Sequence, residues 1–332
     1  MKRLRVGVVG LGFIGALHAR AFAECPNAEL VAVTDLDATR SSEISSRHAC
    51  HDYPDLETML QKETLDAVAI CSPDPTHRDV AVQAAQHGLD ILLEKPIATT
   101  AADALAITQA VDAAGTRMMV AHLLHFDPRY AILKQSARRG ELGEIVHLHF
   151  RRTNPRTNGR RLGGTSIFWY IGIHDFEMML TCARATPVRA YAQAVSKINA
   201  DIGCEDSVFA TITFDNGAIG MIELSWALPE NTALGINTYA EVVGTKAVGY
   251  VTVFDQGISF YSDHAVRFPD ALHWPEYNGQ IQGDLRHEIQ HFVDATLNGR
   301  PYVVETDTAI QSVKVVEACQ ESIRSGLPVD IT

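Results

Sequence analysis

The sequence predicts an α/β fold in two parts: a doubly wound parallel sheet, then an α+β domain with a large, open, mainly antiparallel sheet. Two observations lead to this prediction. Up to about residue 122, short branched apolar runs alternate with alanine-rich segments, as in successive β–α–β units. After Pro128, strand-like runs separated by turn sequences predominate. The 332-residue chain is long enough for two cores, which we expect at residues 1–122 and 123–332.

The expected strands of the first part are apolar runs, as in a parallel sheet that is buried on both faces. They lie at residues 4–9, 30–34, 67–70, 91–93 and 118–121. The helices expected between them lie at residues 16–23, 76–86 and 100–114. Gly88 and Gly115 are expected to end the last two helices, because glycine is favoured just past a helix end.

Turn sequences identify two hairpins in the second part. One joins residues 208–214 to residues 218–226 through Asp215-Asn216-Gly217, and the other joins residues 251–254 to residues 258–261 through Asp255-Gln256-Gly257. Helices are expected near residues 129–139 and at residues 308–324, the second of them ending at Gly326.

A glycine motif, GLGFIG, directly follows the first expected strand and opens the first helix. In that setting Gly10 permits a tight turn, Gly12 lets the backbone approach a pyrophosphate, and Gly15 lets helix pack on strand. Asp35 ends the second strand, twenty positions past Gly15, where a carboxylate would bind the adenosine ribose and repel a 2′-phosphate. The pattern indicates a Rossmann-type dinucleotide site that prefers NAD to NADP.

Composition excludes several classes of function. Net charge is −12, which argues against nonspecific nucleic-acid binding and against a basic membrane-binding surface. No apolar stretch approaches transmembrane length, and the N-terminal segment has no signal-peptide cleavage region. The six cysteines are scattered without a CxxC motif, so we expect reduced thiols in a cytoplasmic protein.

Five segments occur in the order seen in one known family. They are GLGFIG, Asp35, CSPDPTH (residues 71–77), Glu94-Lys95-Pro96 and GIHDFEMM (residues 172–179). Over nearly its whole length the chain resembles the glucose–fructose oxidoreductase, inositol dehydrogenase and rhizopine catabolism family. The resemblance implies an NAD(P)-dependent oxidoreductase that acts on a sugar, inositol or related polyol.

The resemblance also implies site residues. The lysine of Glu-Lys-Pro, here Lys95, would face substrate and nicotinamide, and the histidine of the second domain, here His174, would act in proton transfer. The implied cofactor-binding residues are Gly10, Gly12, Phe13, Ile14, Gly15, Asp35, Ser72, Pro73, Thr76, His77, Glu94 and Lys95. The substrate is expected in a cleft beside the nucleotide domain.

The chemistry of alcohol oxidation accounts for a lysine and a histidine together. Hydride leaves for the cofactor, so the protein must supply a base and stabilise the developing oxyanion. Many family members have aspartate four residues before the histidine, whereas this chain has Tyr170. In a helix Tyr170 would share a face with His174, but a neutral phenol cannot stabilise an imidazolium as a carboxylate does. Asp175, the next residue, is expected to have a structural role as a helix cap.

An arginine-rich stretch is relevant to the identity of the substrate. Strand alternation places Val146, Leu148, Phe150, Arg152 and Asn154 on one face, so an apolar face becomes polar near the expected cleft. Arginines follow at positions 151, 152, 156, 160 and 161. On one interpretation these arginines lie in a solvated loop or at a subunit contact. On the other, the stretch contributes to a binding site in which Arg152 and Asn154 bind a carboxylate, phosphate or sugar nucleotide. His125 is a further candidate substrate contact.

One motif suggests different chemistry. Residues 287–291 read HEIQH, which matches the HExxH zinc motif, but no third ligand can be nominated. We expect an amphipathic helix there and no metal.

Two alternatives to a polyol dehydrogenase remain open: a dehydrogenase or keto-reductase of an anionic sugar derivative, and an NAD-binding sensor that has lost catalysis. The presence of both Lys95 and His174 argues against the sensor. An open sheet with helices on one side leaves its other face uncovered. We therefore expect a homodimer or homotetramer joined through the second domain's sheet, with the tetramer favoured, as the family resemblance also implies.

Overall fold

The computed structural model describes the whole chain except residues 1, 162–163, 233–234 and 254–255. Contacts divide it into two units, residues 1–126 with 272–310 and residues 127–271 with 311–332. The sequence predicts one boundary, at residues 122/123. It does not predict that residues 272–310 return to the first unit. That return follows from helix α9 (Asp284–Leu297), whose apolar face packs on the first helix and first strand of the chain.

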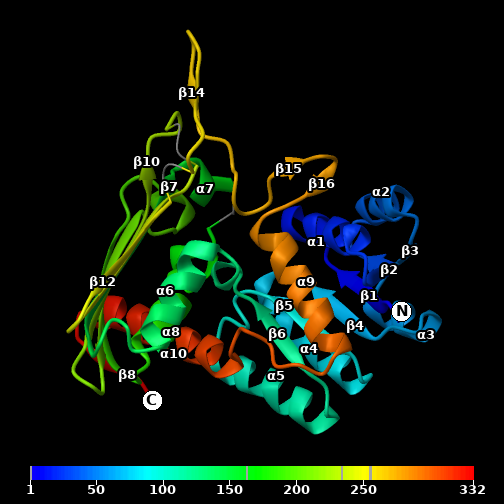
Figure 1. The fold of residues 1–332 in the computed structure, drawn as a ribbon, viewed down its shortest axis with the longest axis horizontal. Coiled ribbons are helices and arrows are strands. Elements are labelled where there is room, and N and C mark those ends of the chain that lie inside the picture. The colour runs from blue at the N-terminus through cyan, green and yellow to red at the C-terminus, as the bar shows by residue number, and fades with distance from the viewer. Residues whose placement is uncertain (1, 162–163, 233–234, 254–255) are drawn as a thin grey trace. The chain divides into compact units, whose positions relative to one another are not determined.

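The first unit is built on a six-stranded parallel sheet (Figure 1). Its strands are β1 (Leu4–Val9), β2 (Ala28–Thr34), β3 (His51–Tyr53), β4 (Ala67–Ile70), β5 (Asp90–Glu94) and β6 (Met118–Ala121). They are ordered β3-β2-β1-β4-β5-β6, the doubly wound order in which ligands bind beyond the carboxyl ends of the strands near β1 and β4. This part of the fold prediction is confirmed, although β3 is not among the predicted strands.

Helices flank this sheet. They are α1 (Phe13–Glu24), α2 (Ala38–His48), α3 (Leu56–Lys62), α4 (His77–Gln86), α5 (Ala101–Ala114) and α9, with 3₁₀ turns η1 (Asp74–Thr76) and η2 (Leu123–His125). Side chains of Asp37, Asp55 and Thr100 cap α2, α3 and α5 by accepting backbone N–H bonds. Gly115 ends α5 in the left-handed conformation, as predicted.

A short two-stranded segment, β15 (Glu276–Tyr277) with β16 (Gln280–Ile281), lies on α1 in the same unit. Arg20 Nη1 of α1 donates to Glu276 Oε2 over 2.9 Å, and the Ile281 N–H donates to Glu24 Oε2 over 2.8 Å. These contacts attach residues 272–283 to the helix that follows the glycine loop.

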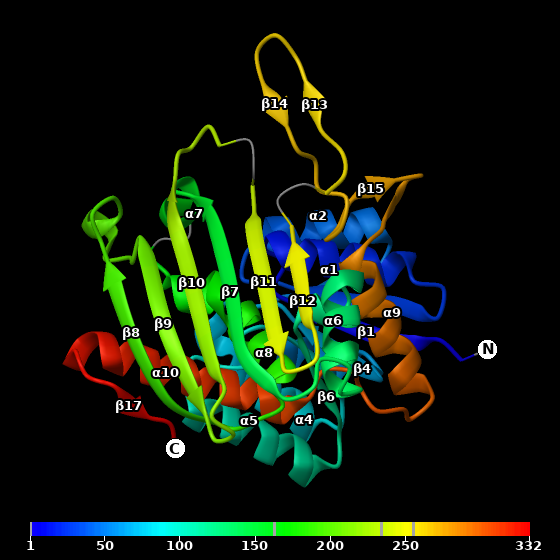
Figure 2. The ribbon, with the colours of Figure 1, turned by 60° about the vertical axis from the view of Figure 1, so that its left-hand side comes forward.

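The second unit contains a seven-stranded sheet ordered β12-β11-β7-β10-β9-β8-β17 (Figure 2). Its strands are β7 (Ile145–Pro155), β8 (Pro187–Val195), β9 (Ser207–Phe214), β10 (Ile219–Leu228), β11 (Asn237–Gly244), β12 (Val248–Thr252) and β17 (Val329–Asp330). All neighbouring pairs are antiparallel except β7 with β10, so the predicted mainly antiparallel sheet is confirmed.

Helices cover one face of this sheet and leave the other open (Figure 2). The helical elements are α6 (Pro128–Arg138), α7 (Thr157–Arg161), the π-helical turn η3 (Phe168–Gly172), α8 (Ile173–Ala183), the 3₁₀ turn η4 (Ala200–Ile202) and α10 (Thr306–Ser325). Burial alternates along β9 and β10, as expected for strands with one face in a core. Leu148, Phe150, Arg152 and Asn154 of β7 are buried, as their shared face predicts, but Val146 is exposed near the strand's start.

One predicted hairpin is confirmed and one is wrong. β9 and β10 pair through the turn at residues 215–217, where Gly217 has φ +86°. The second prediction fails because β12 pairs with β11, while β13 (Phe260–Tyr261) pairs with β14 (Val266–Arg267) in a separate projecting hairpin (Figure 2). Phe254, the last residue of the first predicted strand, and Asp255, the first residue of the predicted turn, lie outside the described residues.

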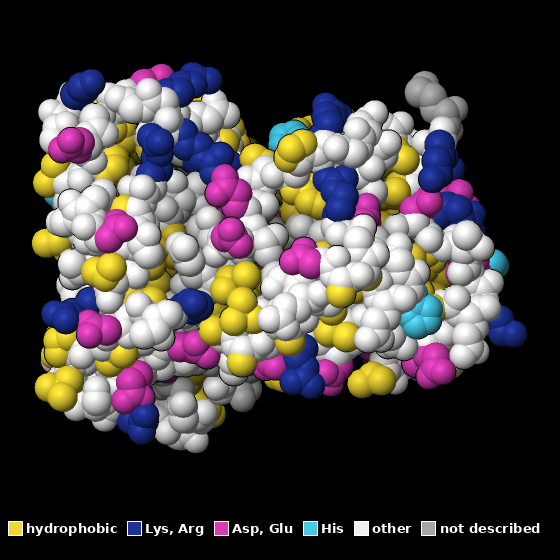
Figure 3. Space-filling view, turned by 90° about the horizontal axis from the view of Figure 1, so that it is seen from below, with side chains coloured by type: hydrophobic (Ala, Val, Ile, Leu, Met, Phe, Trp, Pro, Cys, Tyr) yellow, Lys and Arg dark blue, Asp and Glu magenta, His cyan; other side chains and the backbone are white. Residues whose placement is uncertain are grey.

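No helix among the described residues combines the length and the apolar character needed to cross a membrane. On the face shown in Figure 3, acidic, basic and apolar side chains are interspersed.

Candidate active site

The glycine loop between β1 and α1 has the geometry that the motif predicts. Gly10 has φ +83°, and a Cβ there would lie 2.6 Å from the Ser72 backbone. A Cβ on Gly15 would lie 1.9 Å from the Gly10 carbonyl oxygen, so the helix packs directly on the turn. A Cβ on Gly12 would meet nothing within 4 Å, so the backbone there borders open space.

The N-terminus of α1 also fits an anionic ligand. Its N-cap, Gly12, provides no side chain to accept the first backbone N–H groups, whereas α2, α3 and α5 are capped. A pyrophosphate would take those N–H groups and interact favourably with the helix dipole. The residues present therefore fit a dinucleotide, and Gly12, Phe13 and Ile14 would contact its phosphates.

Asp35 lies at the carboxyl end of β2, beside the glycine loop. Its Oδ2 accepts the Leu11 N–H over 2.6 Å and its Oδ1 accepts the Asp37 N–H over 2.8 Å. Burial opposes ionisation, but these two N–H groups and Arg40 outweigh it and lower the pKa of Asp35. The carboxylate is thus ionised and fixed where the motif predicts an acceptor for ribose hydroxyls.

The segment after β4 forms a second edge of this site. The Thr76 hydroxyl donates to Ser72 Oγ over 2.7 Å, and η1 begins just after Pro73. His77 is fully buried, with Nδ1 at 2.8 Å from the Pro96 carbonyl and Nε2 at 3.0 Å from the Ser72 carbonyl. Its ring therefore joins the loop after β4 to the loop after β5, which is a structural contact.

Lys95 follows β5 at the same edge of the sheet. It is half-buried, while Glu94 before it and Pro96 after it are buried. Glu94 Oε2 accepts the Lys95 N–H over 3.0 Å, and Glu94 Oε1 accepts from His18 Nε2 over 3.0 Å. Glu94 thereby connects the Lys95 backbone to α1. Burial raises the pKa of Glu94, but His18 and the Lys95 charge outweigh it and the net shift is downward.

Helix α9 contributes a second buried acid, Glu288. Burial, with the negative charges of Glu94 and Asp284, raises the pKa of Glu288 well above its usual value. Glu288 is the glutamate of the HExxH pattern, and His291 Nε2 of that pattern accepts the Val303 N–H over 3.0 Å. Among the residues that the structure describes, no three His, Cys, Asp or Glu side chains are grouped to hold a metal ion.

His174 and Tyr170 stand out in the second unit. Every residue from 167 to 183 is buried except these two, which are half-buried. The segment is helical throughout, as the shared-face argument required, but a π-helical turn spans Phe168–Gly172 and α8 begins at Ile173. The Tyr170 ring packs edge-on against Trp226 with centroids 6.3 Å apart.

Arg152 does not present its guanidinium to a substrate, as the anion-binding hypothesis requires. Its Nε donates to Asp175 Oδ2 over 2.6 Å and its Nη2 donates to Asp175 Oδ1 over 3.2 Å, and both side chains are buried. The guanidinium fork is therefore already paired within the unit. The expected capping role of Asp175 is also wrong, because its carboxylate bonds to β7 across the unit interior.

Other predicted polar residues have internal partners too. Asn154 Nδ2 donates to the Gly235 carbonyl over 2.8 Å. Arg151 donates to Asn237, and Arg160 forms an exposed ion pair with Asp201 at 3.0 Å. His125 is buried in η2 of the first unit.

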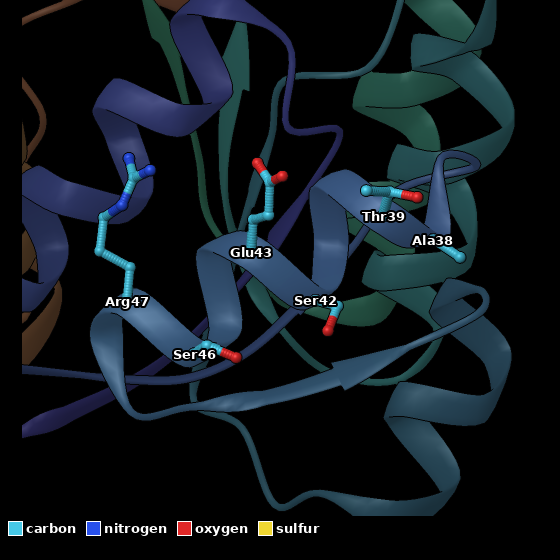
Figure 4. Close-up of a pocket in the computed structure, with 6 residues that line it drawn as sticks. All are labelled: Ala38, Thr39, Ser42, Glu43, Ser46 and Arg47. Atoms are coloured by element: carbon cyan, nitrogen blue, oxygen red, sulfur yellow. The ribbon is translucent and has the colours of Figure 1, made fainter.

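A shallow hollow lies over α2 (Figure 4). It is lined by Ala38, Thr39, Ser42, Glu43, Ser46 and Arg47. It contains none of the predicted cofactor or substrate residues, and we assign it no ligand.

Comparison with known proteins identifies the family. Residues 4–122 match the description "Oxidoreductase family, NAD-binding Rossmann fold", and residues 130–248 match the GFO/IDH/MocA C-terminal domain. The chain belongs to the GFO/IDH/MocA oxidoreductase family. Its first unit is accordingly an NAD-binding Rossmann fold, and the cofactor prediction is confirmed.

Similar family members span almost the whole chain. A scyllo-inositol 2-dehydrogenase (NAD(+)) of Bacillus subtilis is 29% identical, covering 99% of this chain and 96% of its own. A D-apiose dehydrogenase of Paraburkholderia graminis is 26% identical, covering 100% and 90%. The crystal structure of a Lactobacillus casei scyllo-inositol dehydrogenase with bound NAD(H) and scyllo-inositol shares the fold, with TM-score 0.86, 18% identity and 99% of each chain covered.

Two buried residues that interact with Glu94, His18 and Glu288, were not predicted from the sequence. His18 lies three positions after Gly15 on a helix that otherwise buries small or apolar residues, which was a usable signal. In the sequence, Glu288 is recognisable only as part of a zinc motif. Its burial against the sheet depends on the return of α9, which no local pattern reveals.

Proposed function

We propose that this enzyme is an NAD(H)-dependent dehydrogenase of a secondary alcohol in a sugar, inositol or related polyol. The observation that carries the proposal is Lys95, half-buried at the carboxyl edge of the sheet that also bears the glycine loop and Asp35. The names of the relatives, inositol and apiose dehydrogenases, support the substrate class.

Lys95 and His174 have separate roles in the proposed chemistry. NAD, when bound, accepts the hydride. His174 takes the hydroxyl proton as general base, and the Lys95 ammonium donates a hydrogen bond to the developing oxyanion. Tyr170 donates a hydrogen bond to a substrate hydroxyl. Glu94 acts through Lys95, because its carboxylate holds the Lys95 backbone N–H.

A substrate panel tests the proposal. NAD reduction would be followed at several pH values with inositols, aldoses, apiose and sugar acids. Turnover of a neutral polyol supports the proposal. Tight NAD binding without turnover of any of them would favour the sensor alternative instead. The anionic-substrate alternative has lost its main support, because Arg152 is paired with Asp175.

The cofactor preference gives a first prediction. The wild-type enzyme is expected to bind NADH at least about tenfold tighter than NADPH, because Asp35 would repel a 2′-phosphate. Asp35→Ala should reduce the difference between the NADH and NADPH affinities, which a fluorescence titration measures. Glu43→Ala, which removes an exposed charge from α2, is the matched control and should leave the difference between the two affinities unchanged. Equal affinities in the wild-type enzyme would contradict the role of Asp35.

The open sheet face gives a second prediction. Strand register places exposed apolar side chains on the face without helices, namely Phe209, Ile219, Met221, Val248 and Tyr250. We propose a homodimer or homotetramer through this face, with the tetramer favoured. Light scattering at micromolar concentration should show an oligomer, which Phe209→Arg dissociates and Tyr261→Arg, on the projecting hairpin, does not. A monomeric wild-type protein would refute this arrangement.

We also propose a cytoplasmic location. All six cysteines are free in the structure, five of them buried, as expected where thiols stay reduced. Fractionation of the native host would test this.

A further inference from the structure

A buried histidine that the proposed chemistry does not use contacts the carboxylate before Lys95. His18 on α1 is fully buried, and its Nε2 lies 3.0 Å from Oε1 of Glu94. Its other ring nitrogen, Nδ1, is buried without a hydrogen-bond partner among the residues that the structure describes. A proton on Nδ1 would be an unsatisfied buried donor, so the ring proton belongs on Nε2, which donates to Glu94.

Hydrogen bonds form a chain from α1 to Lys95. Glu94 Oε1 accepts from His18, and Glu94 Oε2 accepts the Lys95 backbone N–H over 3.0 Å. Burial acts to raise the pKa of Glu94, and the hydrogen bond from His18 is the largest of the contributions that lower it, ahead of the Lys95 charge. Without His18, Glu94 would therefore take up a proton more readily.

The other titratable groups around Glu94 do not replace His18. They are Cys71 after β4, Asp74 in η1 and Glu288 on α9. Each is an acid, so in its ionised form it would disfavour the Glu94 carboxylate. Burial raises the pKa of all three, and that of Cys71 and Glu288 well above the usual value. The residues that favour the Glu94 anion are thus His18 and Lys95.

We propose that His18 is a positioning residue for the reaction: by donating to Glu94 it keeps this carboxylate an anion, which holds the Lys95 backbone and favours the charged form of the Lys95 amine. The inference rests on the role of Lys95 in the proposed function. In this scheme His18 acts through Glu94 and not by contact with the substrate.

The first experiment measures how fast the Lys95 amine reacts with acetic anhydride, because only a neutral amine reacts. The purified enzyme is labelled at several pH values without substrate, and mass spectrometry compares Lys95 with the exposed Lys62. In His18→Leu, Lys95 should be labelled about tenfold faster relative to Lys62 near pH 7, because Glu94 loses its charge more readily. His18→Gln, whose amide can still donate to Glu94, should keep the wild-type ratio.

Two buried acids provide matched variants. Glu94→Gln removes an ionised carboxylate and should raise the labelling ratio as His18→Leu does, whereas Glu288→Gln replaces a protonated acid and should leave the ratio unchanged. Combining His18→Leu with Glu94→Gln should give no further increase. An unchanged ratio in His18→Leu, or additive effects in the double variant, overturns the proposal. If His18→Leu does not fold, His18→Asn replaces it, because the asparagine amide is too short to reach Glu94.

The pH dependence of polyol oxidation is a second readout. Loss of the hydrogen bond from His18 raises the pKa of Glu94, so the carboxylate is protonated at a higher pH as the pH falls. In His18→Leu the acid side of the pH–rate profile should therefore move up by about one pH unit, and His18→Gln should restore it. An acid side at the wild-type pH in His18→Leu contradicts the proposal. If the wild-type enzyme oxidises no polyol, the proposed function fails, but the labelling ratio still decides the role of His18.

Discussion

Lys95→Ala and His174→Ala are each expected to lower turnover by about 10²–10⁴, the usual contribution of a positioned acid or base. The reason is that the chemistry requires a proton acceptor and a hydrogen-bond donor for the oxyanion, and these residues are proposed to supply them. NADH affinity should remain within a few-fold of wild type, since the glycine loop and Asp35 are unchanged. Initial rates of NAD reduction and fluorescence titration are the two measurements.

Matched controls separate this result from a general loss of charge. Lys62→Ala on α3 and His264→Ala on the projecting hairpin remove exposed side chains of the same types and should keep full turnover. Tyr170→Phe should lower turnover less than His174→Ala does, because the phenol orients the substrate proton but does not accept it. Near-wild-type turnover in Lys95→Ala or His174→Ala would remove that residue from the mechanism.

Arg152→Ala is expected to destabilise the protein by about 3–5 kcal/mol, because it leaves the buried Asp175 carboxylate without its charge partner. Burial already raises the pKa of Asp175, and Arg152 is the group that opposes this shift. Urea unfolding followed by circular dichroism would measure the loss in free energy of unfolding.

The chain offers an exposed pair for comparison. Arg160 and Asp201 form a similar ion pair with side chains 46% and 61% exposed, so Arg160→Ala should lower the free energy of unfolding far less than Arg152→Ala does. Replacing both buried partners, as Arg152→Met with Asp175→Leu, should recover much of the stability lost in Arg152→Ala. An equal, small effect of Arg152→Ala and Arg160→Ala would show that the buried pair does not stabilise the fold.

The site was predictable where its residues follow directly from a strand. Asp35 and Lys95 each come just after a short apolar run, and parallel strands bring their carboxyl ends to one edge of the sheet. The conformations of Gly10 and Gly15 were predictable for the same reason, because the tight strand–turn–helix connection leaves no room for a side chain. The strand pairing of residues 251–261 was not predictable, because a turn sequence indicates where the chain can reverse direction but not which strands become neighbours.

The sequence by itself determined the fold class, the dinucleotide loop and the presence of Lys95 and His174, because periodicity, turn chemistry and motif spacing act over a few residues. Only the tertiary structure decided how the buried charges are paired. Arg152 reads as a candidate anion ligand until Asp175, twenty-three residues later, is seen to occupy its guanidinium. His18 and Glu94 are seventy-six residues apart. A buried charge is stable only beside a partner, and packing of distant elements determines which partner that is.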